Sequence, residues 1–256
     1  MAEQEQTSTY PDHDLEEVAG KGIIVTGGTT GIGRATALLL ASRGAKVLIF
    51  GRHEEELNDA MNDLRHAGSD VHGMIADTSK PEDIKRIFEV ADAKLGRVDV
   101  LVNNAALAAG GVAEGVYDDW EYVVRVNLLG YMACAHEAIT RMKQQGSGHI
   151  VNIGSMSADV REQGSSVYVA TKSGIQGFSE ALRKEVNRDG IKVTLIEPGS
   201  VGTDMQQPSP EEQRQKEEKG EMLRAEDIAA CVYYCLIQPK RCDVVEVRIR
   251  PHLQEI

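Results

Sequence analysis

The 256-residue sequence has little that would suit a nucleic acid or a membrane. Its 28 lysine and arginine residues are outnumbered by 40 aspartate and glutamate residues, which gives a formal net charge of -12. Because the phosphates of nucleic acids and anionic lipids attract basic surfaces, this excess of acid disfavours both as partners. No apolar run is long enough to span a bilayer. We therefore expect a protein that binds neither nucleic acid nor membranes.

Cysteine is scarce, with only Cys134, Cys231, Cys235 and Cys242 in the chain. These residues form no Cys-x-x-Cys pair and show no Cys/His spacing of the kind that binds a metal. Cys231 and Cys235 share one face of an expected helix, where two small buried thiols are the simpler interpretation. The N-terminus also lacks the basic-then-apolar pattern of a secretory signal. We expect a cytoplasmic protein without a metal site.

The composition changes once along the chain. Residues 1–18 are polar and acidic, contain Pro11 and lack an apolar period, so we expect a disordered or loosely packed N-terminal tail. Residues 19–256 suit one catalytic α/β domain and leave no room for a second core of comparable size. A charged insertion, residues 209–221, interrupts this domain late in the chain.

Short β-rich runs alternate with amphipathic helical stretches after the tail. The expected strands are Gly22–Thr26, Lys46–Phe50, Val71–Ile75, Val100–Asn103, His149–Ile153, Lys192–Glu197 and Val244–Ile249. The expected helices are Gly33–Arg43, Glu54–Ala67, Pro81–Leu95, Trp120–Gln144, Val169–Asp189 and Ala225–Gln238. The strands are continuous apolar runs, as burial on both faces of a parallel sheet requires. This alternation predicts a three-layer α/β/α domain with a doubly wound parallel sheet, the Rossmann fold.

A glycine-rich turn, residues 26–33, joins the first expected strand to the first expected helix. Gly27 and Gly31 allow the backbone to approach a pyrophosphate closely, and Gly33 allows the helix to pack tightly on the sheet. The free N–H groups at the start of that helix would then face the phosphates. A glycine turn alone is a weak signal. A strand directly before it and a helix directly after it favour a dinucleotide site.

The end of the second expected strand indicates which dinucleotide binds. An acid at this point accepts a hydrogen bond from the ribose 2′-OH of NAD, whereas an arginine accommodates the 2′-phosphate of NADP. Here Gly51 stands in place of the acid and Arg52 follows it. The alternative is that Arg52 is a solvated charge paired with Glu54–Glu56. Because the acid is also absent, we expect NADP(H) to be preferred, with NAD(H) as the alternative, although Thr30 supplies no second basic anchor.

Three residues form a candidate site for proton transfer. Tyr168 and Lys172 lie one helical turn apart on the same face. A free phenol has a pKa of about 10, and a cation one turn away would lower it and produce a tuned general acid/base. Ser155, just past the fifth expected strand, would hydrogen-bond the substrate oxygen. Each feature also has a simpler interpretation, namely an amphipathic contact for the pair and a helix cap for the serine.

The order and spacing of these motifs resemble the short-chain dehydrogenases/reductases, in the single-domain branch of about this length, from Gly22 to about Thr203. The resemblance implies four catalytic residues, which are Asn127, Ser155, Tyr168 and Lys172. It also implies a set of cofactor-binding residues: Gly27, Thr29, Thr30, Gly31, Ile32, Gly33, Arg52, Asp77, Asn104, Ala105, Tyr168, Lys172, Pro198, Gly199, Val201 and Thr203. In the family the aspartate meets adenine, the lysine binds the ribose hydroxyls and the asparagine supports a water chain.

The resemblance implies an NADP(H)-dependent oxidoreductase that moves a hydride between nicotinamide and the carbonyl or secondary alcohol carbon of a small substrate. One alternative is a catalytically silent dinucleotide-binding sensor or scaffold, which predicts damage to the Tyr168/Lys172 pair. Another is an epimerase or dehydratase, which the glycine spacing disfavours. The C-terminal run Val245–Pro251 is similar to that of a branch that includes dehydrogenases for small polar 3-hydroxy acids. Arg161 is either a solvated charge or an anchor for an anionic substrate.

Two expected helices carry more small and apolar surface than one sheet face requires. The first follows Tyr168 and contains Ala170, Ser173, Gly174, Gly177, Phe178, Ala181 and Leu182. The second follows Asn127 and contains Leu128, Tyr131, Met132, Ala135 and Ile139. Relatives pair these helices across a two-fold axis, so we expect a homo-oligomer, a dimer or a tetramer. The alternative is that both stripes are ordinary core.

Overall fold

Parallel strands form one sheet in the computed structural model, which describes residues 15–206 and 208–254. The seven strands are β1 (Gly22–Thr26), β2 (Lys46–Gly51), β3 (Val71–Ile75), β4 (Val100–Asn103), β5 (Gly148–Ile153), β6 (Ile191–Pro198) and β7 (Glu246–Ile249). They lie in the order β3-β2-β1-β4-β5-β6-β7, and every neighbouring pair is parallel. The direction of winding therefore reverses between β1 and β4, where sheets of this kind bind ligands at the carboxyl ends of the strands.

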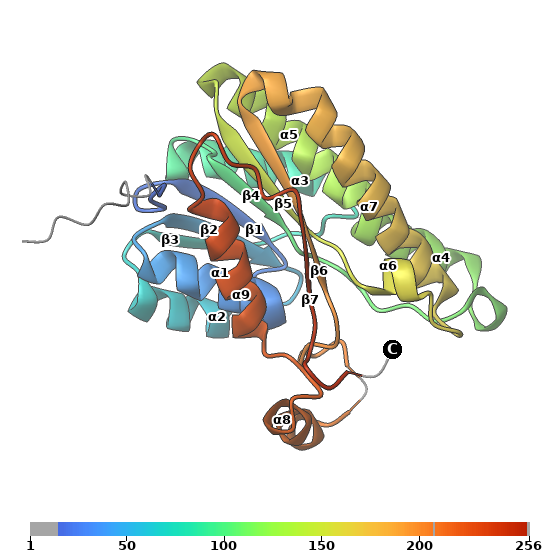
Figure 1. Cartoon of the computed structure of the whole chain (residues 1–256). Helices are drawn as coiled ribbons and strands as arrows, with labels where there is room; N and C mark the ends of the chain where they lie inside the picture. Colours follow the sequence, from blue (N-terminus) through green and yellow to red (C-terminus); the bar gives the residue numbers. More distant parts are fainter. Residues whose placement is uncertain (1–14, 207, 255–256) are drawn as a thin grey trace, which may run out of the picture.

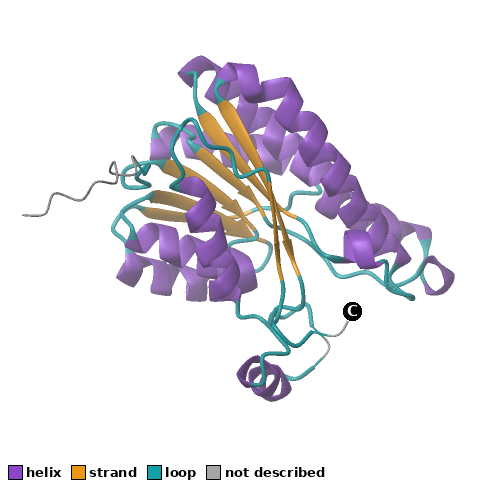
Figure 2. Ribbon diagram, viewed as in Figure 1, coloured by secondary structure: helices purple, strands orange, loops and turns teal. Residues whose placement is uncertain are grey.

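Helices cover both faces of this sheet (Figures 1 and 2). One face carries α1 (Gly31–Ser42), α2 (Glu54–Ala67) and α9 (Ala225–Leu236), and the other carries α3 (Pro81–Leu95), α5 (Gly130–Gln145) and α7 (Ser166–Val186). Shorter helices are α4 (Tyr117–Val124), α6 (Ser157–Val160) and α8 (Pro210–Glu218), with single turns at Val112–Glu114 and Asn187–Asp189. The arrangement confirms the predicted three-layer Rossmann fold.

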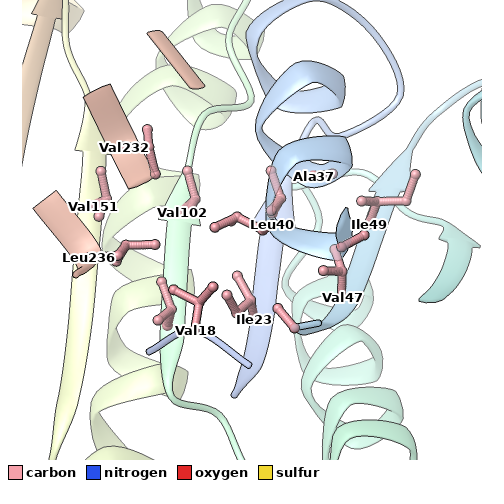
Figure 3. Close-up of a cluster of buried hydrophobic side chains, with 14 of the residues drawn as sticks. Val18, Ile23, Ala37, Leu40, Val47, Ile49, Val102, Val151, Val232 and Leu236 are labelled. Carbon is pink, nitrogen blue, oxygen red and sulfur yellow. The ribbon is translucent and has the colours of Figure 1, made fainter. Parts of the chain in front are cut away.

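The apolar strand runs serve two cores at once. Ile23 and Val25 of β1 pack with α1 and α9, whereas Ile24 between them packs in the core on the other face. Figure 3 shows the first of these cores, in which Leu40 of α1 and Leu236 of α9 lie over the strands. Burying an aliphatic side chain of this size contributes roughly 1.5–3 kcal/mol, so alternate residues of one strand stabilise both helical layers. This explains why the central strands are continuously apolar, whereas the edge strands β3 and β7 contain polar residues and are only partly buried.

The N-terminal segment enters this core earlier than the sequence suggests. Of the expected tail, residues 1–14 lie outside the described residues. Val18 is 3% exposed and belongs to the core beneath α1 and α9. The backbone N–H of Glu16 donates to the carbonyl oxygen of Ile237 at 2.8 Å. The packed part of the chain therefore includes Val18, whereas we expected the tail to extend through residue 18.

Two helical segments differ from the sequence expectation. The expected helix over 120–144 begins earlier, at Tyr117, and contains a π-helical turn at Arg125–Leu129 that separates α4 from α5. The charged insertion forms α8, although it has no apolar period. Ser209 accounts for this helix, because its hydroxyl accepts from the backbone N–H of Glu212 and the Glu212 carboxylate accepts from the backbone N–H of Ser209.

Over the residues that the structure describes, no helix is long and apolar enough to cross a membrane. The same residues contain no group of three or more histidine, cysteine or acidic side chains arranged to hold a metal ion. All four cysteines are free, with Cys134 and Cys235 buried and Cys242 exposed.

Candidate active site

Hydrogen bonds between side chains and the backbone connect the glycine turn to the end of β4. The Thr26 hydroxyl accepts from the backbone N–H groups of Asn104 and Ala105, at 2.8 and 2.9 Å. The Asn104 amide donates in return to the carbonyl oxygens of Thr26 and Gly27, at 3.0 and 3.1 Å. A Cβ at Gly33 would lie 2.2 Å from the Gly27 oxygen, so only glycine fits there. The start of α1 is thereby fixed against β4.

A cavity of about 310 Å³ opens at this junction. Ten of the expected cofactor-binding residues line it: Gly27, Thr29, Thr30, Gly31, Ile32, Arg52, Asp77, Asn104, Ala105 and Thr203. Gly27 and Gly31 have positive φ angles of 62° and 51°, which glycine adopts without strain. The first turn of α1 carries no acid and no side-chain cap, so its N–H groups face the cavity without a competing acceptor. These features suit the phosphates of a dinucleotide.

Other expected cofactor residues lie beside the cavity without lining it. Pro198 ends β6, and the backbone N–H of Gly199 donates to the carbonyl oxygen of Ile249 at 2.8 Å. Val201 is 4% exposed and bridges to Leu223. This segment therefore serves first as a scaffold that carries Thr203 to the cavity wall opposite the glycine turn. Gly33, Tyr168 and Lys172 also stand outside the lining.

Arg52 and Asp77 meet through a tyrosine at one end of the cavity. Arg52 Nη1 donates to the Tyr122 hydroxyl at 2.5 Å, and the guanidinium lies 5.7 Å from the centre of the Tyr122 ring. The same hydroxyl donates to Asp77 Oδ2 at 2.9 Å. Burial raises the pKa of Asp77, but hydrogen bonds from Ser79 and Tyr122 outweigh it and leave this pKa below its usual value. Asp77 is therefore an anion beside the cavity, and the bonding partner of Arg52 is Tyr122.

Tyr168 and Lys172 stand one turn apart near the start of α7. The Lys172 ammonium is buried and donates to the Ile153 carbonyl oxygen at 2.9 Å. It lies 5.7 Å from the centre of the Tyr168 ring. Burial lowers the pKa of Lys172 to about 8, against an opposing effect of Glu197. The predicted helical spacing is thus present, with the lysine aimed at a strand end.

The pKa of Tyr168 differs from the sequence expectation. Burial raises it above its usual value, and a hydrogen bond with Ser155 lowers it only in part. The lowering expected from Lys172 is not found, because the ammonium is itself desolvated and directed toward Ile153. Ser155 Oγ accepts from the backbone N–H of Ser157 at 3.1 Å, which fixes the hydroxyl beside the phenol.

Asn127 lies in the π-helical turn between α4 and α5 and is fully buried. Its side chain exchanges two hydrogen bonds with the backbone of Leu107, accepting at 2.7 Å and donating at 2.8 Å. It also donates to the Thr171 hydroxyl at 3.4 Å, and that hydroxyl donates to the Tyr168 carbonyl at 2.8 Å. Asn127 therefore joins the loop after β4, the π turn and the helix that carries Tyr168. Turns of this kind recur at functional sites.

Arg161 follows α6, between Ser155 and Tyr168. Its φ of 58° is positive, which is uncommon for a residue other than glycine. The guanidinium Nε donates to the Ala158 carbonyl oxygen at 3.3 Å, so it caps the short helix.

Glu197 is a buried acid that sequence reasoning missed. It is 0% exposed and lies near the end of β6, on the strand that ends at Pro198. Arg248 of β7 approaches it at 3.2 Å and also pairs with Asp159 and Glu246, so one cation serves three carboxylates. Burial raises the pKa of Glu197 to about 7. The available signal was an acid within the apolar strand run Leu195–Pro198.

The fold and this arrangement define a doubly wound α/β protein with a buried tyrosine–lysine pair and a cavity whose lining suits a dinucleotide. A family model described as short chain dehydrogenase matches residues 21–214, and the chain belongs to the short-chain dehydrogenase/reductase family of oxidoreductases. This finding confirms the resemblance seen in the sequence.

Individual relatives match over nearly the whole chain. An uncharacterized oxidoreductase of Staphylococcus aureus is 34% identical over 229 residues, which are 89% of this chain and 96% of the relative. A crystal structure of an actinorhodin polyketide ketoreductase variant with NADPH superposes with a TM-score of 0.82 at 31% identity, covering 92% of this chain and 98% of that one. A Burkholderia cenocepacia short chain dehydrogenase in complex with NADP has a TM-score of 0.82 at 27% identity, covering the same 92% and 98%.

The raised pKa of Glu197 makes a prediction about stability. The pKa of this carboxyl group is about 7 in the folded protein and near 4.3 in the unfolded chain. The protonated group therefore contributes its full stability to the fold below about pH 4.3. This contribution is lost as the pH rises through 7. Glu197→Gln, which stays neutral, should match the wild type at about pH 4 and exceed its free energy of unfolding by on the order of 3 kcal/mol at about pH 8. Urea unfolding at both pH values measures the difference.

Glu246→Gln is the matched control, because Glu246 contacts the same arginine from an exposed position. Its stability should fall with pH in the same direction as that of the wild type but over a slightly smaller range, because burial is the main cause of the raised Glu197 pKa and the Glu246 charge adds to it. Parallel curves for Glu197→Gln and the wild type would contradict the assignment of a raised pKa to Glu197.

Proposed function

We propose that the protein is an NADP(H)-dependent oxidoreductase acting on the carbonyl or secondary alcohol group of a small substrate, as expected from the sequence. The observation that carries the proposal is the juxtaposition of Ser155, Tyr168 and the buried Lys172 at the end of β5, beside a cavity built for a dinucleotide. The NADPH and NADP in the two related structures support the choice of cofactor.

Each residue of the site has a role in this proposal. When bound, NADP(H) supplies or takes up the hydride at the substrate carbon. Ser155 holds the substrate oxygen by a hydrogen bond, and Tyr168 donates a proton to that oxygen in reduction or accepts one in oxidation. Lys172 orients the ribose, while its ammonium stays bonded to the Ile153 carbonyl oxygen and the pKa of Tyr168 remains above its usual value. Asn127 holds the loop after β4 against the helix that carries Tyr168.

The residues for cofactor binding divide by the part of the cofactor that each would hold. The turn from Gly27 to Gly33, with Thr29, Thr30, Gly31 and Ile32, would hold the pyrophosphate at the start of α1. Arg52 would take the 2′-phosphate, and Asp77 the adenine. Asn104 and Ala105 would border the ribose, and the segment Pro198–Thr203 the nicotinamide. The intact tyrosine–lysine pair favours an enzyme over the silent sensor or scaffold.

A homo-oligomer, dimer or tetramer, is part of the proposal. Gly177 and Ala181 of α7 are exposed, and Leu129 and Met132 beside and on α5 are 52% and 37% exposed. The expected stripes are therefore divided. Tyr131, Ala135 and Leu182 belong to the core, and Leu128, Ile139 and Phe178 pack against it, so the surface open to a second copy is the exposed part of the stripes. We further propose a cytoplasmic location, which the four free cysteines support.

Replacing the phenol by a phenyl ring tests the mechanism. Tyr168→Phe keeps the ring but removes the proton that is exchanged, so kcat should fall by about 100- to 10,000-fold. The dissociation constant of NADPH, measured by fluorescence titration, should change by less than about threefold, because the ring still packs. Tyr117→Phe, at a position 70% exposed on α4, is the control and should keep full activity. Near wild-type turnover by Tyr168→Phe would refute the mechanism.

The cofactor preference yields a second test. An acid at position 51 should bind the ribose 2′-OH of NAD, but a Cβ there would lie 2.6 Å from Thr29 Oγ1 and Cγ2. Gly51→Asp therefore requires Thr29→Ala. Combined with Arg52→Ala, these changes should lower the ratio of NADPH to NADH efficiency by about ten- to a hundredfold. Steady-state kinetics with both cofactors measures this ratio, and a wild type that uses NADH as efficiently as NADPH would rule out the preference.

The oligomeric state is tested by light scattering. We expect a mass of at least twice the 27.9 kDa of the chain at micromolar concentration. Gly177→Glu should lower it, because a Cβ at Gly177 meets nothing within 4 Å inside one protomer and the added charge would meet only a partner. A wild-type mass near 27.9 kDa would exclude the oligomer.

A further inference from the structure

Tyr122 is absent from both the expected site and the cavity lining, yet it contacts two residues that line the cavity. It lies on α4, 70 residues from Arg52 and 45 residues from Asp77 along the chain. Its hydroxyl accepts from Arg52 and donates to Asp77, and its ring lies beneath the guanidinium at 5.7 Å. The position of Arg52 therefore depends on α4 as well as on the strand end that carries it.

The direction of these hydrogen bonds determines what the hydroxyl does. A tyrosine hydroxyl has one proton to donate and oxygen lone pairs to accept with, and here both functions are used. The hydroxyl proton is used in the hydrogen bond to the Asp77 carboxylate, so the hydroxyl oxygen can only accept a hydrogen bond from Arg52. The anionic Asp77 and the cationic Arg52 are thus held apart by a neutral group, although they attract each other.

Arg52 keeps most of its bonding capacity in this arrangement. The bond to Tyr122 uses Nη1, whereas a guanidinium carries five N–H donors in a planar fork. A direct pair with Asp77 would use two of these donors in a bidentate bond and would neutralise the charge. The bond to the neutral hydroxyl keeps the other donors out of such a pair, and Arg52 is one of the residues that line the cavity.

We propose that Tyr122 is a positioning residue for cofactor specificity. Its ring and hydroxyl hold the Arg52 guanidinium at the cavity for the 2′-phosphate of NADP(H) and keep it from closing onto Asp77. The inference rests on the proposed NADP(H) preference and extends it to a residue of α4. It requires that Tyr122 act through Arg52, so NADH binding, which involves no 2′-phosphate, should depend less on the hydroxyl.

Binding without turnover tests the inference on the full-length protein. Dissociation constants for NADPH and NADH are measured by fluorescence titration, and those for adenosine 2′,5′-bisphosphate and 5′-AMP by calorimetry. Tyr122→Phe should weaken NADPH and the bisphosphate by about three- to tenfold, as expected for one lost hydrogen bond. NADH and 5′-AMP lose no 2′-phosphate contact, so they should weaken by a smaller factor, limited to the change at Asp77, and the NADPH to NADH ratio should fall. Tyr122→Leu, which also removes the ring, should weaken NADPH further.

Tyr233→Phe is the matched control, since the Tyr233 ring also lies under an arginine, Arg43 at 5.3 Å, away from the cavity. It should leave all four constants unchanged. Comparison with Arg52→Ala shows how Tyr122 acts. In that background Tyr122→Phe should no longer affect the NADPH to NADH ratio, because the arginine that it positions is gone.

The outcomes separate the inference from the proposed function. A wild type that binds NADPH no better than NADH would overturn both. A wild type that prefers NADPH, with the same preference in Tyr122→Phe, would overturn the role of Tyr122 alone. A change in the ratio that persists in the Arg52→Ala background would also overturn it, because Tyr122 would then act without Arg52.

Discussion

The close backbone contact between the glycine turn and the end of β4 is the constraint on which the site depends. Four hydrogen bonds between Thr26, Gly27, Asn104 and Ala105 join two strands at the point where the winding of the sheet reverses. The contact leaves no room for a Cβ at Gly33, so the turn, the start of α1 and the end of β4 form one rigid piece. Pyrophosphate recognition by backbone N–H groups needs such rigidity, because those groups cannot adjust independently of the helix that carries them.

A series of hydrogen bonds connects this contact to the residues proposed for proton transfer. The chain that leaves β4 reaches Leu107, whose backbone is held by Asn127, and Asn127 in turn meets Thr171 beside Tyr168. The π turn at Asn127 adds a residue to one helical turn and so frees backbone geometry for these side-chain bonds. On the sheet side, the Ile153 carbonyl accepts from both Lys172 and Tyr131. Lys172 is therefore positioned from the sheet side, and Tyr168 from the side of Asn127 and Thr171.

Sequence reasoning succeeded where one strong local pattern determines the structure. The β-rich runs of β1, β3 and β4 and the amphipathic periods of α2 and α3 predicted their bounds correctly. It missed α8, because a capping box rather than an apolar period begins that helix, and it missed the π turn, because the apolar period continues across it. Tyr122 was beyond its reach, since its role arises from partners on other elements, whereas Glu197 was missed although an acid within an apolar strand run is a visible signal. The glycine turn and the Tyr168/Lys172 pair could be proposed from the sequence because the spacing within each motif is local.

The electrostatics of the site are local and oppose the charge of the whole chain. A net charge of -12 repels an anionic dinucleotide at long range, but at physiological ionic strength such repulsion is screened beyond about 8 Å. Within that distance the N–H groups of α1 and the guanidinium of Arg52 face the cavity. Asp77 is one of the acids that line this cavity with Arg52, and Tyr122 stands between the two. If the protein binds NADP(H) as proposed, recognition of the 2′-phosphate depends on the position of Arg52, to which Tyr122 contributes, as recognition of the pyrophosphate depends on the glycine turn.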